Sequence, residues 1–584
     1  MTDAEPHPVL ASRPPRRTDP SLGSFPPSTK RRWSAPRQDG EVLADPLLAD
    51  TPRLIQHEQV SRAGRDQTVR VAGVPLGELR RQARGELAGL ARGFAQRHKL
   101  PATGLGPLED PTIPLVVTGH QPDWIHPGVW FKMIAAHALA RRVGGAGLNV
   151  AVDQDLLKRV TLKVPDGHSP DWTPRALPFD RGEGEAIHEF WRVRDLDLFA
   201  SLAARVRQTL GSLVPDPLIE PYQAEALRVE GEVTLGERHT VARARIERAW
   251  GLGIDEIPMS GIARTESFLT LLLDLATQAE RFRMLHNIIL HEHRRRHKIR
   301  SRHHPFADLG QSPEGWVETP FWVWSSSHPR RRPLLARGRG NRVELAAPES
   351  LSGRGSGSGP DRFVDFSASR TDRGSALEAL ARLDSQGIRI RPRALTTTLF
   401  LRWCLADWFL HGIGGAHYDQ LGDLIASRWF QAEPPPFSLL SLTKHLRPNQ
   451  PDRDETLRQR RQINQRLRDL AQHPEQQIST SDFGVPEQAE GLRQLMAEKR
   501  QWINAPTTTR AQRAERCRAL RRIQGQFAER LGDSRAQLIA QRDEIESRLV
   551  ILDRRTDREY AIVLHSATET RALFQRILAE SDLV

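Results

Sequence analysis

Two histidines lie close together in a loop of chemistry-bearing residues, Gly119–Gly128 (GHQPDWIHPG). A histidine can bind an anion or transfer a proton near neutral pH. We predict that His120 and Gln121 contact a substrate or anion beside Gly119, with His126 nearby. The alternative interpretation is a glycine turn whose histidines serve only in packing.

The segments on either side predict where this loop lies. Ile113–Val117 is a short apolar run rich in β-branched residues, typical of a buried strand, and Pro127 opens a helical pattern that continues to about Arg142. A loop between a strand and a helix lies at the carboxyl end of the strand, where open parallel sheets bind ligands. The helix N-terminus adds free N–H groups that suit a phosphate or carboxylate.

Asp153 and Asp155 follow a second apolar run, Leu148–Val152, which we predict to be the next strand of a βαβ unit. Two carboxylates at a strand end can hold an amine, a ribose or a metal ion. Asp153 or His120 can serve as a general base for an attacking amine. The alternative is that both carboxylates are helix N-caps.

A third group of candidates follows a predicted short strand, Ile388–Ile390. It comprises residues at a strand-to-helix junction and at a glycine turn. We predict that they bind substrate and close the far side of the same cleft: Arg391, Thr397, Gly414, Gly415 and Tyr418. Simple N-capping and turn formation would explain the same residue types.

Metal and disulfide chemistry are not expected. His293 and His297 are four residues apart and share a helix face, but Arg294–Arg296 lie between them and would repel a cation. Cys404 and Cys517 are far apart and are the only cysteines. We therefore predict no metal site and no disulfide framework.

The rest of the core region predicts further elements, although residues 160–260 are mixed in character. We expect helices over Leu76–Phe94, Thr265–His297, Thr398–Phe409 and Tyr418–Phe430, strands over Trp316–Trp324 and Arg332–Leu345, and a Gly/Ser linker over 351–360.

The two ends of the chain differ from the core. Residues 1–48 are rich in Pro, Arg and Ser, so we predict disorder. Leu531, Leu538, Ile545 and Leu552 recur every seven residues, which predicts a coiled-coil seam in a long antiparallel helical hairpin. We therefore expect three parts: a disordered segment over 1–48, an α/β core over 49–437 with an inserted connecting region at about 160–385, and a helical domain over 438–584.

The net charge and the hydropathy of the chain limit which classes of partner are expected. The net charge of the 584 residues is +13, and only eight of the 85 basic residues are lysines. Such a charge permits binding to anions, but no helix-turn-helix, zinc-finger or RNA-binding signature is present, so we do not expect nucleic acid as the main partner. No apolar run approaches the roughly 18 residues of a membrane span, and no signal peptide is present. We expect a cytoplasmic protein that does not bind membranes.

Three blocks resemble the cysteine-adding enzyme family of bacillithiol synthesis (BshC). Residues 117–122 (VTGHQP) are similar to the family's T-G-Q-Q-P loop, and residues 152–155 (VDQD) to its E-D-H-D. Residues 391–420, from Arg391-Pro392 through Gly414-Gly415 to Tyr418, are similar to its R-P…T-L-L-P…G-G-P-x-E-x-x-Y block. The order and spacing of the blocks agree with the family.

The resemblance implies a Rossmann-like parallel-sheet core, helical connecting segments and a C-terminal coiled coil that helps build a homodimer. It also implies a ligase that joins cysteine to the amine of glucosaminyl-malate, an amino sugar conjugate, through an amide bond. The family's requirement for a nucleotide is open. Five family residues are replaced in the predicted pocket, so we expect the substrate to be altered: the replacements are His120, Val152, Gln154, Ala416 and His417.

Three functions therefore remain under consideration. The first is this ligase-like enzyme, which predicts that His120, Asp153 and the Gly414-Gly415 turn converge in one pocket. The second is a non-catalytic binding or scaffold protein that acts through its coiled coil. The third is an arginine-rich nucleic-acid binder, which predicts a contiguous basic surface and binding that weakens steeply with salt.

Overall fold

The computed structural model describes residues 33–182, 185–301, 305–348, 360–367, 369, 372–447, 453–472 and 486–583. The chain forms two compact units. Unit 1 comprises residues up to Val164, Arg175–Leu446 and Arg558 to the C-terminus, and unit 2 comprises Pro165–Pro174 and Arg447–Asp557. Each unit is described by itself below.

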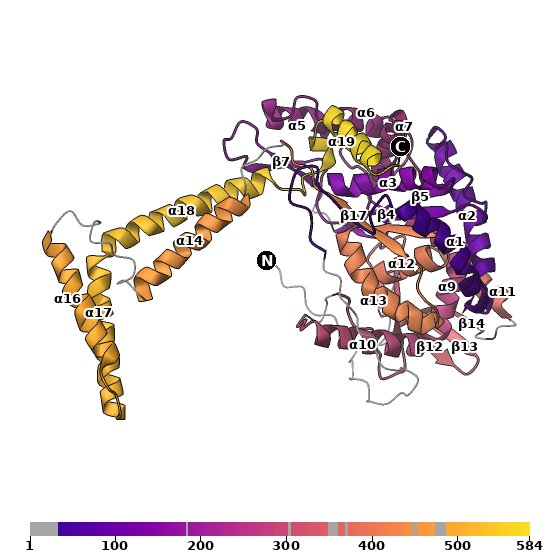
Figure 1. The fold of residues 1–584 in the computed structure, drawn as a ribbon. Helices are drawn as coiled ribbons and strands as arrows, with labels where there is room; N and C mark the ends of the chain where they lie inside the picture. The colour runs from indigo at the N-terminus through magenta and orange to yellow at the C-terminus, as the bar shows by residue number, and fades with distance from the viewer. Residues whose placement is uncertain are drawn as a thin grey trace. The chain divides into compact units, whose positions relative to one another are not determined.

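Unit 1 is built on a six-stranded sheet in which only the edge strand β1 runs antiparallel to its neighbour (Figure 1). In spatial order the strands are β1 (Val42–Asp45), β17 (Phe437–Leu442), β16 (Trp408–His411), β4 (Leu115–His120), β5 (Ala146–Ala151) and β10 (Asp255–Pro258). The central strands are apolar and buried on both faces, as in parallel sheets covered by helices.

The order of the five parallel strands indicates where a ligand would bind at the edge of the sheet. Numbered along the chain, they lie in the order third, second, first, fourth, fifth, so the direction of winding reverses between β4 and β16. In such doubly wound sheets, ligands bind outside the carboxyl ends of the strands. This order confirms the predicted α/β class with a parallel sheet.

Helices cover both faces of this sheet (Figure 1). On one face α3 (Pro127–Arg142) packs against β4, β5 and β17, and α19 (Ala567–Glu580) packs on α3. On the other face lie α12 (Ala394–Trp403) and α13 (Ile413–Phe430), which pack against β16. Because α3 is buried along nearly its whole length, its residues are apolar on every side.

A second, antiparallel sheet of five strands lies in the same unit. Its order is β14 (Asp361–Ser367), β13 (Arg342–Ala347), β12 (Arg332–Arg339), β11 (Val317–Ser325) and β15 (Ile388–Pro392). One continuous hydrophobic cluster joins the two sheets and the helices between them.

The remaining elements of unit 1 connect or cover these sheets. The helices are α1 (Thr51–Thr68), α2 (Leu76–Arg97), α4 (Leu196–Ala200), α5 (Leu202–Leu210), α6 (Ile219–Leu227), α7 (Leu235–Ala249), α8 (Met259–Ile262), α9 (Glu266–Thr277), α10 (Ala279–Arg296) and α11 (Arg373–Ser385), with 3₁₀ turns at Gly211–Leu213 and Ile562–Leu564. The short strands are β2 (Arg70–Val71), β3 (Val74–Pro75), β6 (Leu156–Leu157), β7 (Thr161–Pro165), β8 (Pro174–Pro178) and β9 (Ala186–Ile187).

Several predicted elements have different boundaries. The helix predicted over Thr265–His297 is two helices, α9 and α10, separated at Gln278, and the strand predicted over Arg332–Leu345 is the hairpin β12–β13, which turns at Gly340 with φ +58°. The helix predicted over Thr398–Phe409 begins at Ala394 and ends at Trp403, and its last predicted residues belong to strand β16. Residues 398–409 are mostly apolar and contain no glycine or proline, so their pattern does not separate a buried helix from a buried strand.

The predicted boundaries of the core also change. Residues 1–32 lie outside the described residues, but residues 42–45 form β1, which pairs with β17, so the predicted disorder of 33–48 is wrong for this segment. The chain beyond residue 437 does not all belong to a separate domain. It first supplies β17 to the core sheet and later returns there with α19. The partner of β1 in the sheet and the helix against which α19 packs lie hundreds of residues away, and local composition carries no trace of them.

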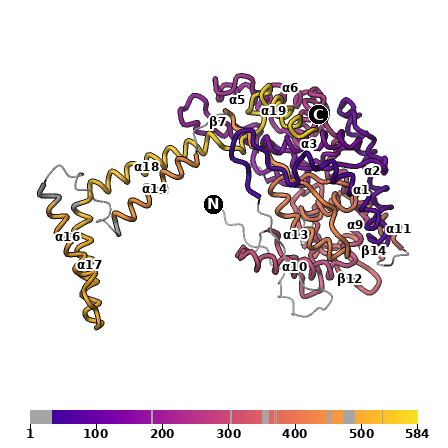
Figure 2. The backbone as a smooth tube through the Cα atoms, in the orientation of Figure 1, coloured from indigo at the N-terminus to yellow at the C-terminus, as the bar shows by residue number. Residues whose placement is uncertain are grey.

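Unit 2 is helical, with α14 (Arg453–Gln472), α16 (Pro486–Asn504), α17 (Arg510–Arg530) and α18 (Gly532–Arg555). Helix α14 lies along α18, and α16 along α17 (Figure 2). Arg453 pairs with Asp553, and Arg460 lies 3.5 Å from Glu546, so α14 and α18 run antiparallel.

The predicted heptad residues lie in and before α18, where Leu538 and Leu552 are buried within the unit. Leu531 packs with Ile523 and Phe527 of α17 and with residues of α16. Leu531 is therefore packed within its own unit, while Ile545 is only half-buried, and the homodimer stays a prediction.

Candidate active site at the carboxyl edge of the parallel sheet

The loop 152–155, which follows β5, separates two cavities in unit 1. The first, called the Asp153 cavity, has a volume of about 470 Å³ and also borders β10, α7 and the start of α8. The second, called the Asp155 cavity, has a volume of about 310 Å³ and lies toward β11, β15 and α12. Asp153 lines one cavity and Asp155 the other, because residues 153–155 form a turn in which the alternation of an extended strand no longer applies.

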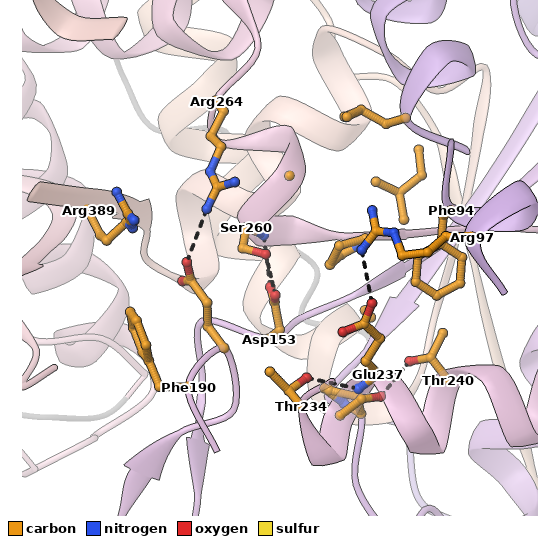
Figure 3. Close-up of a pocket in the computed structure, with 18 of the residues that line it drawn as sticks. Phe94, Arg97, Asp153, Phe190, Thr234, Glu237, Thr240, Ser260, Arg264 and Arg389 are labelled. Carbon is orange, nitrogen blue, oxygen red and sulfur yellow. Dashed lines mark hydrogen bonds and ion pairs between the residues drawn. The ribbon is translucent and has the colours of Figure 1, made fainter. Parts of the chain in front are cut away.

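Asp153 is the best-defined polar group of the first cavity. Its Oδ1 accepts a hydrogen bond from the backbone N–H of Ser260 at 2.8 Å, and its Oδ2 accepts one from the Ser260 hydroxyl at 2.5 Å. The two residues meet because β5 and β10 are parallel neighbours, and Ser260 begins the helix that follows β10. Figure 3 shows Asp153 and Ser260 in the middle of the cavity wall, between Arg264 and Arg389 on one side and Arg97 and Glu237 on the other.

Burial, and then the negative charge of Glu189, raise the pKa of Asp153 to about 7. The hydrogen bonds from Ser260 and the charge of Arg391 act in the opposite direction and are weaker. A carboxyl with this pKa gains and loses a proton near neutral pH, as a general base requires.

Arg391 supports this site without lining the Asp153 cavity. Its Nε and Nη2 bind the two carboxylate oxygens of Glu189 at 3.0 and 2.6 Å, and both side chains are buried. Glu189 itself lines the cavity, where Arg264 lies 3.9 Å from it. Arg391 was predicted to bind substrate, but its side chain does not line this cavity. Its guanidinium is engaged in positioning Glu189.

The Asp155 cavity has a different character. Asp155 accepts hydrogen bonds from Gln121 Nε2 at 2.9 Å and from Arg331 at 3.1 Å. Burial raises the pKa of Asp155, but these bonds more than offset it, so its pKa lies below the ordinary value and the carboxylate stays ionised. The guanidiniums of Arg331 and Arg393 lie over the ring of Trp322, 5.4 and 4.0 Å from its centre. This wall combines cationic and aromatic groups.

Thr397 reaches this cavity only through another residue. Its hydroxyl accepts a hydrogen bond from Gln154 Nε2 at 3.1 Å, and Gln154 lines the Asp155 cavity. The Oε1 atom of Gln154 is buried and has no hydrogen-bond partner among the described residues. Tyr418 is 38% exposed and packs on Phe306, which also lines the cavity.

The histidines of the first loop belong to the switch point between β4 and β16. His126 caps α3, because its Nδ1 accepts from the backbone N–H of Gly128 at 3.1 Å. His120 donates through Nδ1 to the carbonyl of Gln121 at 3.0 Å. Burial, and then nearby positive charges, lower the pKa of His120 to about 4 and that of His126 to about 3, so both rings are neutral at pH 7.

Lys132 lies beneath the same loop and was not among the predicted site residues. Its ammonium donates to the Gly119 carbonyl at 2.8 Å, and burial lowers its pKa to about 7. It contributes to the lowered pKa values of His120 and His126.

The predicted glycines are explained by close packing at two of three positions. A Cβ on Gly119 would lie 2.9 Å from the Val150 carbonyl oxygen, and one on Gly415 would lie 2.7 Å from the His411 ring. A Cβ on Gly414 would meet nothing within 4 Å. Only Gly414 is therefore free to face a ligand, and neither Gly414 nor Gly415 lines a cavity described above.

This contrast gives a direct prediction. Gly119→Ala forces the central strands apart and is expected to lower the free energy of unfolding by about 1–3 kcal/mol. Gly414→Ala is expected to raise it by about 0.4–1 kcal/mol, because alanine restricts the unfolded chain and fits the helix. Urea denaturation of both variants checks this. A Gly414→Ala variant that keeps its stability but loses ligand binding would show that Gly414 contacts the ligand after all.

Asp153 and His120 line two neighbouring spaces whose walls share Pro122, Ala151 and Thr240. Asp153 lines the Asp153 cavity, while His120 lines a separate space of about 20 Å³ beside His239 and Arg243. Sequence reasoning missed Ser260, Glu189, Arg264 and the Trp322 wall. None of them had a usable signal in the sequence, since even the strand before Ser260, β10, is Asp-Glu-Ile-Pro and shows no apolar run.

No group of three or more His, Cys, Asp or Glu side chains in the described part of the chain is placed to hold a metal ion. Residues 303 and 304 of the histidine-rich segment lie outside the described residues. No described helix combines the length and the hydropathy that crossing a bilayer requires.

Comparison with protein-family models and with curated proteins found no match.

Proposed function

We propose that the chain is a carbon–nitrogen ligase-like enzyme that joins an amino acid to the amine of an amino sugar conjugate. In this proposal the core is Rossmann-like, α14 and α18 pair as a coiled coil, and the amine substrate binds in the Asp153 cavity. The observation that carries the proposal is Asp153 itself, a carboxyl held by Ser260 at the carboxyl edge of the sheet, with a pKa raised to about 7.

The geometry suits an amine nucleophile that also carries an acidic group. Asp153 and Glu189 present carboxylates to the cavity, and Arg264 and Arg389 present cations to it. An ammonium group beside Asp153 would give up one proton to it. The amine nitrogen would then attack the carbonyl carbon of an activated acyl donor, forming the C–N bond as the bond to the leaving group breaks, and the leaving group would take up the second proton that the nitrogen loses.

The Asp155 cavity offers a place for the second substrate. Its arginines and Trp322 suit an anionic group next to an apolar or aromatic one. The loop 152–155 borders both cavities, so two bound substrates would approach each other there. A nucleotide is one candidate for the activating group, although the chain contains no P-loop sequence.

A thermal-shift panel with the full chain tests this proposal. The ligands are cysteine, other amino acids, glucosaminyl-malate, related amino sugars, ATP and ADP. A ligand at 100 times its dissociation constant stabilises the fold by about 2.7 kcal/mol. We expect amines of this class to stabilise the wild type and Asp155→Asn but not Asp153→Asn. An anionic co-substrate should stabilise both of these variants but not Arg331→Gln, which removes a cation from the Asp155 cavity.

The two aspartate variants serve as matched controls, since each removes one carboxylate from the same loop. If no ligand stabilises the wild type, or if every shift survives in both variants, the proposed site is wrong. The second candidate function would then be favoured, namely a binding or scaffold protein that acts through unit 2. The observation in its favour is that His120 and the Gly414-Gly415 turn do not share a cavity with Asp153.

A further inference from the structure

Helix α17 of unit 2 has two faces of opposite character. Ala519, Ile523 and Phe527 are buried, and Ile523 and Phe527 belong to the hydrophobic cluster of the unit. The opposite face carries four exposed arginines, called here the α17 arginine stripe: Arg510, Arg513, Arg518 and Arg521. At 3.6 residues per turn these four arginines spread over an arc of about 140° on the side away from Ile523, and they span about 16 Å along the helix axis.

The stripe differs from the other arginine-rich surfaces in how its charges are compensated. On α10, Arg295 and Arg296 both pair with Glu292, and in the second sheet Arg342 pairs with Asp365. Among the described residues, no acidic side chain forms an ion pair with any of the four stripe arginines. The two glutamates of α17, Glu515 and Glu529, fall between the buried and the arginine faces.

We propose that the α17 arginine stripe binds the phosphodiester backbone of a nucleic acid, without reading its bases. This inference is independent of the proposed ligase function. Arginine is the residue best suited to phosphate, because its planar fork donates two parallel hydrogen bonds. Each strand of a duplex presents a phosphate about every 3.4 Å along the axis, so a helix face about 16 Å long lies opposite several of them.

The composition of the stripe favours nucleic acid over other anionic partners. Between the arginines the face carries Ala514 and Cys517, with no large apolar residue to insert into a lipid surface. A protein partner would be expected to meet aromatic or aliphatic anchors at the centre of its interface. A helix face with four exposed arginines, none of which has an ion-pair partner among the described residues, matches the closely spaced phosphates of a nucleic acid instead.

Fluorescence anisotropy of the full chain with labelled 30-base-pair DNA, duplex RNA and single-stranded RNA tests the proposal. The test variant replaces all four stripe arginines by glutamine, which has a similar helix propensity. The control variant removes the same charge from four exposed, ion-paired arginines: Arg342→Gln, Arg382→Gln, Arg458→Gln and Arg493→Gln. Circular dichroism checks that both variants keep their helices.

We expect the wild type and the control to bind at least one of the nucleic acids with a steep salt dependence. Four phosphate contacts contribute a slope of about −3.6 in log K against log salt, or a roughly 150-fold loss of affinity between 50 and 200 mM salt. The stripe variant should lose this contribution. Equal losses in both variants, no binding by the wild type, or equally tight binding of polyglutamate would overturn the proposal.

Cys517 gives a second readout at the stripe itself. It is exposed, whereas Cys404, the other cysteine, is buried. Bound nucleic acid should slow alkylation of Cys517 in the wild type and the control and leave it unchanged in the stripe variant. Unchanged alkylation in a wild type that is saturated with nucleic acid would place the binding elsewhere.

Discussion

Asp153→Asn is expected to lower kcat/KM for amide-bond formation by roughly 10²–10⁴-fold, the usual contribution of a positioned general base. Asparagine has the same shape and can still accept the hydrogen bond from the Ser260 backbone, but it takes no proton. The rate of ligation of an amino acid to an amino sugar conjugate measures the loss. A variant that retains a tenth or more of the wild-type rate would exclude Asp153 as the base.

The same substitution is expected to stabilise the fold at alkaline pH. Burial and Glu189 raise the pKa of Asp153 from 3.8 to about 7, so the folded chain holds a proton there between pH 4 and 7 that the unfolded chain has lost. The stability of the wild type therefore falls as the pH rises through this range. Below pH 4 the two proteins should be nearly equal, and at pH 8 Asp153→Asn should be more stable by about 4 kcal/mol, because each pKa unit corresponds to about 1.4 kcal/mol.

Glu189→Gln separates the two causes of the raised pKa. Removing the negative charge of Glu189 should lower the pKa of Asp153 and move the acidic limb of the kcat/KM profile to lower pH, while burial keeps it above the ordinary aspartate value. An acidic limb that stays in place would mean that a group other than Asp153 titrates there.

Local patterns predicted the part of the fold that is local. The β4–α3–β5 unit, with its loops at 119–128 and 152–155, lies where the apolar runs and turn residues indicated, and Asp153 and Asp155 lie at the edge of cavities. The pattern worked there because strand, helix and loop follow one another within about 40 residues of sequence, as expected for a βαβ unit.

Strands β10, β16 and β17 were not predicted, and the reason is physical. Each has only four to six residues, and most of these are buried, so they show no alternation of apolar and polar positions. The residues that contact the site carboxylates could not be predicted either, because they lie far away in the sequence. Ser260 is 107 residues from Asp153, and Arg391 is 202 residues from Glu189, so each pair becomes visible only when the sheet order is known.

The third class of unpredicted feature is a buried ion cluster at the opposite edge of the parallel sheet. Asp407, 1% exposed at the start of β16, accepts hydrogen bonds from Arg80 Nη2 at 2.6 Å, Arg84 Nη1 at 3.3 Å and the Leu115 backbone N–H at 2.7 Å. Arg62 of α1 also pairs with it. One carboxylate therefore ties α1 and α2 to strands β4 and β16.

Asp407→Asn is expected to lower the free energy of unfolding by about 3–5 kcal/mol, because the charges of Arg80 and Arg84 would stay buried without a counter-ion. Asp365→Asn, which breaks the exposed pair with Arg342, is the matched control and should change it by at most about 1 kcal/mol. Urea denaturation, with hydrogen exchange of β4 and β16 as the local probe, measures both. A loss in Asp407→Asn no larger than in the control would mean that the clustered arginines reach water or other acceptors when the carboxylate is removed. In that case hydrophobic packing alone would join α1 and α2 to the sheet.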